Sequence, residues 1–199
     1  MEDTYKTISN CAEGIYKDKG SRFISLAYPV TTEDQIREIV LLVKKEHHSA
    51  RHHCYAWRLG HEKIHFRAND DGEPSSTAGK PILGQIQSFD LTNILIVVVR
   101  YFGGTLLGVS GLINAYRNAA LDAINQAEII ELMVEQHLLI EFGYGVMNEV
   151  MKVFKDEKLP QIDSLFDLNC RIQTQIRLND LFRIEEGLKK IEGLKISYI

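Results

Sequence analysis

The sequence predicts an α+β protein of two domains, residues 1–132 and residues 133–199. Its 199 residues are 45% hydrophobic and 25% charged, which is typical of a globular protein and excludes a mainly disordered or fibrous chain. Runs of β-branched residues alternate with segments whose apolar residues recur at helical spacing, so strands and helices are both expected. The texture changes near residue 132, because the first part holds six of the seven histidines and most of the glycines.

The first part contains clear signals for strands and helices. Thr32 and Gln35 have the spacing of a capping box, and apolar residues at helical spacing after them predict a helix over residues 33–47. Ile94–Tyr101 is apolar at successive positions, which favours a central strand. A glycine-rich connection, Gly103–Gly111, precedes a helix with small residues on one side. The other expected strands are Arg22–Tyr28 and the two strands of a hairpin, His53–Leu59 and Lys63–Arg67.

The second part follows the order βαββαβ, which is the ferredoxin-like split βαβ arrangement. Leu181, Ile184, Leu188 and Ile191 form the apolar stripe of its last helix. The expected elements are a strand at Glu135–Phe142, a helix at 145–158, strands near Gln161–Asp167 and at Asn169–Arg177, a helix at 180–192, and a strand at Leu194–Ile199.

Charge and apolar content exclude several classes of protein. The formal net charge is -4, and each part contributes -2, with 14 basic against 16 acidic residues in the first and 9 against 11 in the second. This balance argues against binding of nucleic acid by bulk charge. The longest apolar run, Ile94–Val99, is far shorter than the roughly 20 residues of a membrane span, and no secretory signal is visible. The three scattered cysteines indicate reduced thiols, so we expect a cytoplasmic protein.

The densest polar stretch is Asp70–Pro81, with the sequence DDGEPSSTAGKP. Its carboxylates could hold Mg²⁺ or act in acid–base chemistry, and its hydroxyls and Lys80 could contact phosphate. The structural alternative is an Asx-type turn followed by a helix with its N-cap at Ser76 or Thr77. The turn alone does not require the Thr-Ala-Gly-Lys-Pro sequence, so we favour a functional role.

A second motif, Ala50–Trp57 (ARHHCYAW), places two histidines and a thiol at the start of a strand. Alternation along a strand puts His52 and Cys54 on one face and His53 on the other. No third ligand at recognised spacing supports a zinc site, and two neighbours on one strand face are an uncommon nucleophile–base pair. We therefore expect no metal site here, with Cys54 as a small buried residue.

The Gly103–Gly111 loop resembles an anion cradle in outline, because it precedes the N-terminus of a helix. It is not a P-loop, since no Gly-Lys-Ser/Thr closes it. A tight turn that uses glycine for close packing explains it equally well. Arg100, beside Tyr101 and Phe102, adds a cation with aromatic neighbours, which suits RNA contacts or a plain packed strand end.

Four segments together resemble the Impact family, in its YigZ-like bacterial branch. They are Lys19–Phe23, Ala50–Trp57, Asp70–Pro81 and Val97–Gly108. The resemblance implies a first domain like ribosomal protein S5 domain 2, with a four-stranded sheet and two helices on one face. It implies a ferredoxin-like second domain similar to the last domain of elongation factor G. Eukaryotic relatives are regarded as regulators of translation, and the bacterial ones have no agreed biochemical activity.

The leading hypothesis is a cytoplasmic, translation-associated regulatory protein that binds RNA or a ribosomal surface and is not an enzyme. The alternatives are a Mg²⁺-dependent enzyme acting on a phosphorylated or nucleotide-like small molecule, and a protein–protein adaptor. Apart from Mg²⁺ under the enzyme alternative, we expect no cofactor, no catalytic residue and no metal, and neither a membrane nor DNA as a partner. The expected phosphate, RNA or anion contacts are Arg22, Arg51, His52, Lys80, Arg100, Gly103 and Gly104, beside a polar loop with Asp70, Asp71, Glu73 and Thr77.

Overall fold

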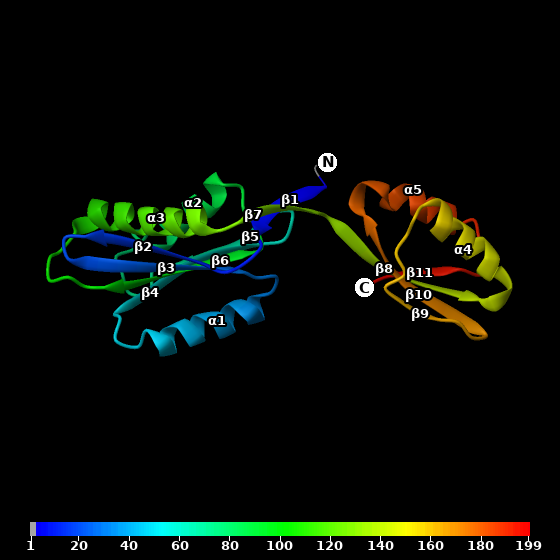
Figure 1. Cartoon of the computed structure of the whole chain (residues 1–199), viewed down its shortest axis with the longest axis horizontal. Helices are drawn as coiled ribbons and strands as arrows, with labels where there is room; N and C mark the ends of the chain where they lie inside the picture. Colours follow the sequence, from blue (N-terminus) through cyan, green and yellow to red (C-terminus); the bar gives the residue numbers. More distant parts are fainter. Residues whose placement is uncertain (1–2) are drawn as a thin grey trace. The chain divides into compact units, whose positions relative to one another are not determined.

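The computed structural model describes residues 3–199 and divides the chain into two compact units (Figure 1). The first unit is Tyr5–Leu132, and the second contains Met133–Ile199 together with Asp3 and Thr4. The division after Leu132 coincides with the change in sequence texture. Asp3 and Thr4, expected in the first domain, group with the second unit, where Asp3 forms an ion pair with Arg177.

The first unit is built on a five-stranded sheet in the order β2-β3-β6-β4-β5, in which all neighbours are antiparallel. The expected four-stranded sheet is therefore wrong by one strand. The missed strand is β2, whose alternation is masked by Gly14 and by the charged residues Glu13 and Lys17. The strand bounds are Ala12–Asp18 for β2, Ser21–Pro29 for β3, Ile94–Tyr101 for β6, His52–Leu59 for β4 and His65–Asn69 for β5.

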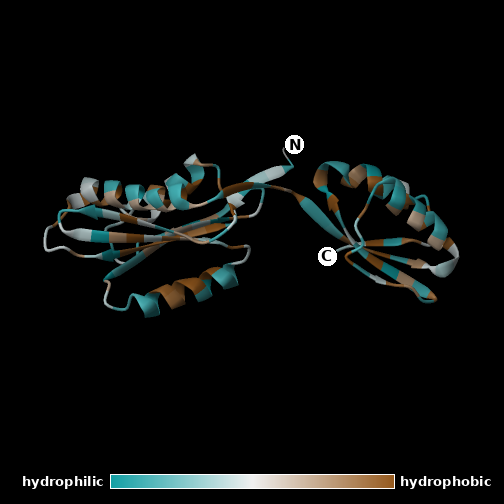
Figure 2. Cartoon of the chain, in the orientation of Figure 1, coloured by the Kyte–Doolittle hydropathy of each residue, from teal (hydrophilic) through white to brown (hydrophobic). Residues whose placement is uncertain are grey.

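Strand β6 lies in the middle of this sheet, as its continuous apolar run predicts (Figure 2). Ile94, Ile96 and Val98 join one buried cluster, and the alternate residues Leu95, Val97 and Val99 join a second. A strand can bury both sets only where both faces of the sheet are covered. The sheet is therefore packed on both sides.

Two helices, α2 (Gly79–Ser88) and α3 (Gly108–Gln126), cover one face, and α1 (Glu33–Glu46) covers the other (Figure 1). The resemblance implied the pair on one face but not α1 on the opposite one. The expected capping box of α1 is present, because Thr32 Oγ1 accepts the Gln35 N–H at 3.3 Å. The Gln35 side chain returns a bond to the backbone of Thr31 rather than of Thr32.

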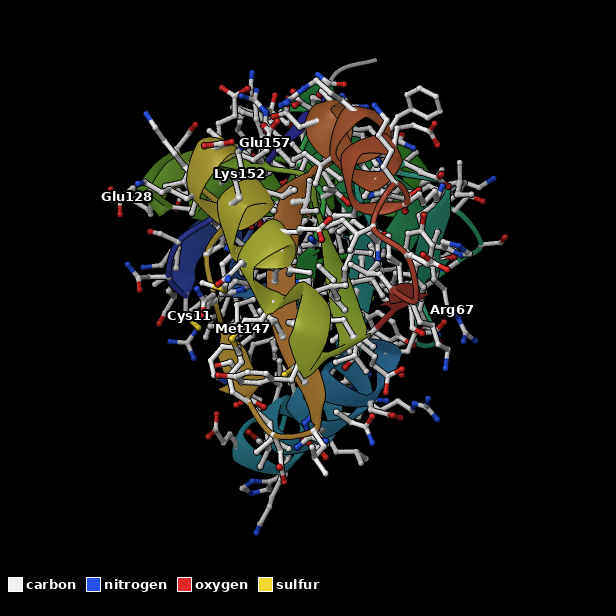
Figure 3. The ribbon with its side chains drawn as sticks, turned by 90° about the vertical axis from the view of Figure 1, so that its right-hand side faces the viewer. Cys11, Arg67, Glu128, Met147, Lys152 and Glu157 are labelled. Atoms are coloured by element: carbon white, nitrogen blue, oxygen red, sulfur yellow. The ribbon has the colours of Figure 1, made fainter. Side chains whose placement is uncertain are left out.

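The second unit has the element order βαββαβ that its sequence predicts. Its antiparallel sheet has the order β11-β8-β10-β9, and α4 and α5 lie together on one of its faces (Figure 1). In Figure 3, α4 faces the viewer, from Met147 at its start to Glu157 just past its end. The bounds are Glu135–Gly143 for β8, Met147–Asp156 for α4, Asp163–Leu165 for β9, Asn169–Arg177 for β10, Leu178–Leu188 for α5 and Lys195–Tyr198 for β11. A 3₁₀ turn at Tyr144–Val146 precedes α4.

A separate two-stranded sheet pairs β1 (Thr4–Ile8) with β7 (Ile129–Met133), at the division between the units. Both strands are short and carry mixed polar and apolar residues, so neither was expected from the sequence. In residues 3–199, no helix is long and apolar enough to cross a membrane.

Candidate functional site

The polar loop begins with Asp70, whose carboxylate organises the start of α2. Asp70 Oδ1 accepts the N–H groups of Ala78 at 3.0 Å and Gly79 at 2.8 Å, and Oδ2 accepts that of Ser76 at 2.8 Å. The first N–H groups of a helix have no partner within the helix, so a carboxylate there stabilises it by hydrogen bonds and by charge. The structural alternative placed the N-cap at Ser76 or Thr77, which is wrong in position, since the N-cap is Ala78 and the carboxylate comes from Asp70.

The neighbouring carboxylate, Asp71, ties the loop to α1 and β4. Its Oδ1 lies 2.8 Å from Lys44 Nζ, and its Oδ2 accepts the backbone N–H of His53 at 2.7 Å. Burial acts to raise the pKa of Asp71, but the hydrogen bonds from Lys44 and from the His53 backbone outweigh it and lower that pKa. The Asp71 carbonyl also lies 2.9 Å from His52 Nδ1, so this residue holds the start of β4 in place.

The third acid, Glu73, is buried and binds two neighbours through one carboxylate oxygen. Its Oε1 lies 2.6 Å from an Arg100 guanidinium nitrogen and accepts the Tyr116 hydroxyl at 2.8 Å. The Cys54 sulfur lies 3.3 Å from the same hydroxyl. Burial raises the pKa values of both Tyr116 and Cys54, so the hydroxyl keeps its proton and the thiol is a poor nucleophile.

Arg100 is a buried cation with spare hydrogen-bonding capacity. Only 8% of its side chain is exposed, and its guanidinium carbon lies 5.5 Å from the centre of the Phe23 ring and 5.7 Å from that of Phe102. Its Nε is buried and has no hydrogen-bond partner among the described residues 3–199. An orphaned donor of this kind is costly in a folded protein, and such groups occur at functional sites.

These groups border a cleft of about 490 Å³ in the first unit, which we call the Arg100 cleft. Four of the expected site residues line it: Arg51, His52, Glu73 and Arg100. The sequence did not predict its apolar wall, which comes from the glycine-rich loop and the start of α3. That wall consists of Phe102, Leu106, Leu107, Val109 and Leu112.

Part of the apolar wall is unusually exposed, with Leu106 at 83% and Val109 at 60%, whereas Leu107 and Leu112 are buried. The signal for it was present, because Leu106, Leu107 and Val109 are large apolar residues inside a glycine-rich loop. Loops are usually polar, and exposed apolar patches mark interaction sites. The loop is therefore an apolar rim of the cleft, and Gly103 and Gly104 do not line it.

Glycine is required at positions 103 and 104 for two different structural reasons. A side chain at Gly103 would place its Cβ 1.8 Å from the Gly20 carbonyl carbon, so this glycine allows close contact with the β2–β3 turn. Gly104 has φ of 88°, in the left-handed region that favours glycine. Helix α3 begins later, at Gly108. These positions match the close-packing interpretation of the loop and do not place Gly103 and Gly104 at the helix start.

The other expected contacts lie outside the Arg100 cleft. Arg22 lies over the Tyr101 ring at 4.9 Å and borders a different hollow. Lys80 is exposed on the first turn of α2, and Thr77 is buried, with its hydroxyl donating to the Pro74 carbonyl at 2.7 Å. Asp70 and Asp71, like Lys80 and Thr77, do not line the cleft, whereas the hollow that Arg22 borders shares Phe102 with it.

No group of three or more His, Cys, Asp or Glu side chains within residues 3–199 is placed to hold a metal ion. The loop carboxylates that could have served Mg²⁺ accept hydrogen bonds from the protein itself, at Asp70 from backbone and at Asp71 from Lys44 and backbone. The donor set therefore fits a structural role better than a cation site.

The chain matches a family model described as the Impact N-terminal domain over residues 19–124. It is 28% identical to the IMPACT family member YvyE of Bacillus subtilis over 195 residues, which is 98% of this chain and 90% of that protein. It is 42% identical to the IMPACT family member YigZ of Escherichia coli over 110 residues, 54% of each chain. A crystal structure described only as a hypothetical protein is 26% identical, with a TM-score of 0.75 over 100% of this chain and 98% of that one.

Proposed function

The chain belongs to the family of the Impact N-terminal domain, and from this premise we propose that it is a translation-associated regulatory protein. Its Arg100 cleft binds RNA, or an RNA-bearing ribosomal surface, without catalysing a reaction. The role in translation extends to this chain what the family resemblance implies. We propose a cytoplasmic location for the same reason, in keeping with the free thiols of Cys11, Cys54 and Cys170.

The observation that supports RNA is the pairing of cations with an apolar wall in one cleft. Arg51 is exposed at its edge, and among residues 3–199 it forms no ion pair, so its guanidinium is free to meet a phosphate. Phe102 offers a ring face, and single-stranded bases stack on aromatic rings and on arginine planes. Glu73 does not repel an anion strongly, because Arg100 neutralises it at 2.6 Å.

The two units support the same proposal by analogy of fold. We infer that the second unit is ferredoxin-like, because the order β11-β8-β10-β9 with both helices on one face is that of a split βαβ domain. The likeness of the first unit to ribosomal protein S5 domain 2 rests on α2 and α3 on one face, beside the differences in strand number and in α1. Fold analogy raises the expectation of an RNA partner but does not establish a function.

The experiment compares Arg51→Ala with Lys80→Ala. Both residues are exposed and both changes remove one positive charge, but only Arg51 lines the cleft. The readout is fluorescence anisotropy of a labelled single-stranded RNA of about a dozen nucleotides, a length within the usual range of single-strand binding sites. We expect Arg51→Ala to weaken binding roughly 3–10-fold, as for loss of one phosphate contact worth about 1 kcal/mol, and Lys80→Ala to change it less than about twofold.

Ribosome co-sedimentation of the same variants covers the ribosomal arm of the proposal. Loss of co-sedimentation with Arg51→Ala but not with Lys80→Ala supports the Arg100 cleft as the contact. Equal effects of the two substitutions would remove the cleft from the interface. A wild-type protein that binds neither RNA nor ribosomes overturns the proposal.

Two alternatives have distinct signatures. The adaptor is favoured by the exposed Leu106 and Val109 at the rim, which would seat an apolar protein segment. If the protein is an adaptor, Leu106→Ser should abolish binding of that protein segment, and the wild-type protein should not bind RNA. The enzyme alternative is tested by a thermal-shift assay, in which nucleotides should raise the melting temperature only when Mg²⁺ is present. It draws less support from the structure, because Asp70 and Asp71 are already engaged.

A further inference from the structure

A second hollow, of about 520 Å³, lies at the turn between β2 and β3, and we call it the hairpin hollow. The proposed function involves the Arg100 cleft and not this hollow. It is formed by one tight turn and by the two aromatic residues at the end of β6. Its lining residues are Lys17, Asp18, Lys19, Gly20, Ser21, Arg22, Tyr101 and Phe102.

The hairpin hollow is cationic and its cations are available. Lys17, Lys19 and Arg22 are all exposed, and none of them forms an ion pair within residues 3–199. Asp18 is the one acid in the lining. The Arg22 guanidinium carbon lies 4.9 Å from the centre of the Tyr101 ring, a cation–π contact that restrains the side chain. Unpaired, oriented cations of this kind suit phosphate.

The turn that carries these cations is rigid. Asp18 pairs with Ser21 across a two-residue loop, and Lys19 and Gly20 have φ of 44° and 81°, as in the favoured hairpin turns. The Gly103 N–H donates to Ser21 Oγ at 3.2 Å, and the close contact of Gly103 with Gly20 locks the turn against the glycine-rich loop. A site on a fixed turn loses little freedom on binding.

The hairpin hollow and the Arg100 cleft share one wall, Phe102, a residue that is 42% exposed. On one side of it lie Arg51 and Arg100, and on the other lies Arg22. An aromatic ring between two sets of cations has the pattern of a single-stranded nucleic-acid path, in which bases stack and phosphates alternate with them.

We propose that a single-stranded RNA segment crosses Phe102 and occupies both hollows, with a base in the Arg100 cleft and phosphates of the following nucleotides on Lys17, Lys19 and Arg22. This inference rests on the proposed function and extends it to the form of RNA that binds. Unpaired strands fit, because a base must leave its stack to reach the cleft, whereas a duplex keeps its bases inside. An acidic peptide would use the cations but not the stacking surface.

The test uses the full chain with the double substitution Lys17→Gln and Lys19→Asn. Asn is chosen at position 19 because it tolerates the positive φ there. The matched control is Lys45→Gln with Lys80→Gln, which removes the same charge from exposed positions that line neither hollow. Equal thermal midpoints of the two double variants and the wild type show that all are folded.

Binding is measured by anisotropy with single-stranded RNAs of about 3 and about 12 nucleotides, below and within the usual site sizes. We expect the hairpin variant to weaken the longer RNA by about tenfold and to leave the shorter one unchanged. Loss of two phosphate contacts should also make the negative slope of log affinity against log salt shallower by about 1.4. The control variant should match the wild type on both RNAs.

The outcomes separate this inference from the proposed function. If Arg51→Ala weakens the longer RNA and the hairpin variant does not, the hairpin hollow is no part of the path, and the proposed function stands. If neither variant differs from its control, both proposals fail. The single-strand path is overturned if the hairpin variant weakens the binding of single-stranded and duplex RNA equally. It is also overturned if that variant loses binding of an acidic peptide while its RNA binding is unchanged.

Discussion

At the scale of single residues, the site depends on a buried network that connects three elements. Arg100 was expected as a ligand contact and Glu73 as part of the polar loop, and the structure shows that the two form an ion pair with each other. Tyr116, a buried residue of α3, donates its hydroxyl hydrogen bond to the same carboxylate. These partners are far apart in the sequence, and no local pattern encodes their pairing. The residue types of a site were therefore readable from the sequence, but their partners were not.

The network predicts different costs for two conservative substitutions. Glu73→Gln keeps the shape but leaves the buried Arg100 charge without its counter-ion, so we expect a loss of about 3–5 kcal/mol in the free energy of unfolding. Tyr116→Phe removes one hydrogen bond and leaves the ion pair intact, with an expected loss of about 1–2 kcal/mol. Urea unfolding followed by Trp57 fluorescence measures both. A smaller loss for Glu73→Gln than for Tyr116→Phe would show that the ion pair does not stabilise the cleft.

At the scale of elements, the sequence predicted those whose signal is local. Strand β6 follows from its continuous apolar run, and α1 from its capping box. Helix α2 was expected from the sequence only as the structural alternative for the polar loop, because Gly79, Pro81 and Gly84 are poor helix formers and its cap comes from Asp70, at the far end of that loop. Its start therefore depends on a carboxylate six to nine residues before the N–H groups that it binds, a spacing outside the usual capping patterns.

Asp70 is expected to be the main support of α2. Asp70→Ala would leave the three N–H groups of residues 76, 78 and 79 without their acceptor, and we expect a loss of about 2 kcal/mol, at the upper end for a helix cap. Asp70→Asn keeps one acceptor oxygen and should cost about half as much. The control is Asp34→Ala in the first turn of α1, whose exposed side chain should contribute less than about 0.5 kcal/mol.

Hydrogen exchange shows where the effect of Asp70→Ala arises. Amide protection should fall first in Gly79–Ser88 and remain in Ile94–Tyr101. If Asp70→Ala costs no more than Asp34→Ala, the carboxylate does not hold the start of α2, and the polar loop has no structural reason for this acid.

At the scale of the whole molecule, the net charge does not describe the local charge around the two hollows. The total of -4 discouraged a nucleic-acid partner, yet four cations that line the two hollows, Arg51, Lys17, Lys19 and Arg22, form no ion pair within residues 3–199, whereas Arg100 is paired with Glu73. Summed charge therefore excludes a general coating of RNA but not a local site.

The division after Leu132 was visible as a change in composition, because each side of it builds its own core: among the described residues, two buried clusters lie in the first unit and one in the second.

Separate cores predict that the two units unfold as separate cooperative transitions. Trp57 is the only tryptophan, and it is buried in the first unit, so its fluorescence reports that unit alone, while far-UV circular dichroism reports both. Leu188→Ala in the buried cluster of the second unit should cost about 2–5 kcal/mol there. It should shift part of the dichroism curve in urea and leave the Trp57 midpoint unchanged. Val98→Ala in the first unit should shift the Trp57 midpoint and leave in place the part of the dichroism curve that comes from the second unit. If Leu188→Ala moves the Trp57 midpoint as far as the dichroism midpoint, the chain unfolds as one unit and the two cores are energetically coupled.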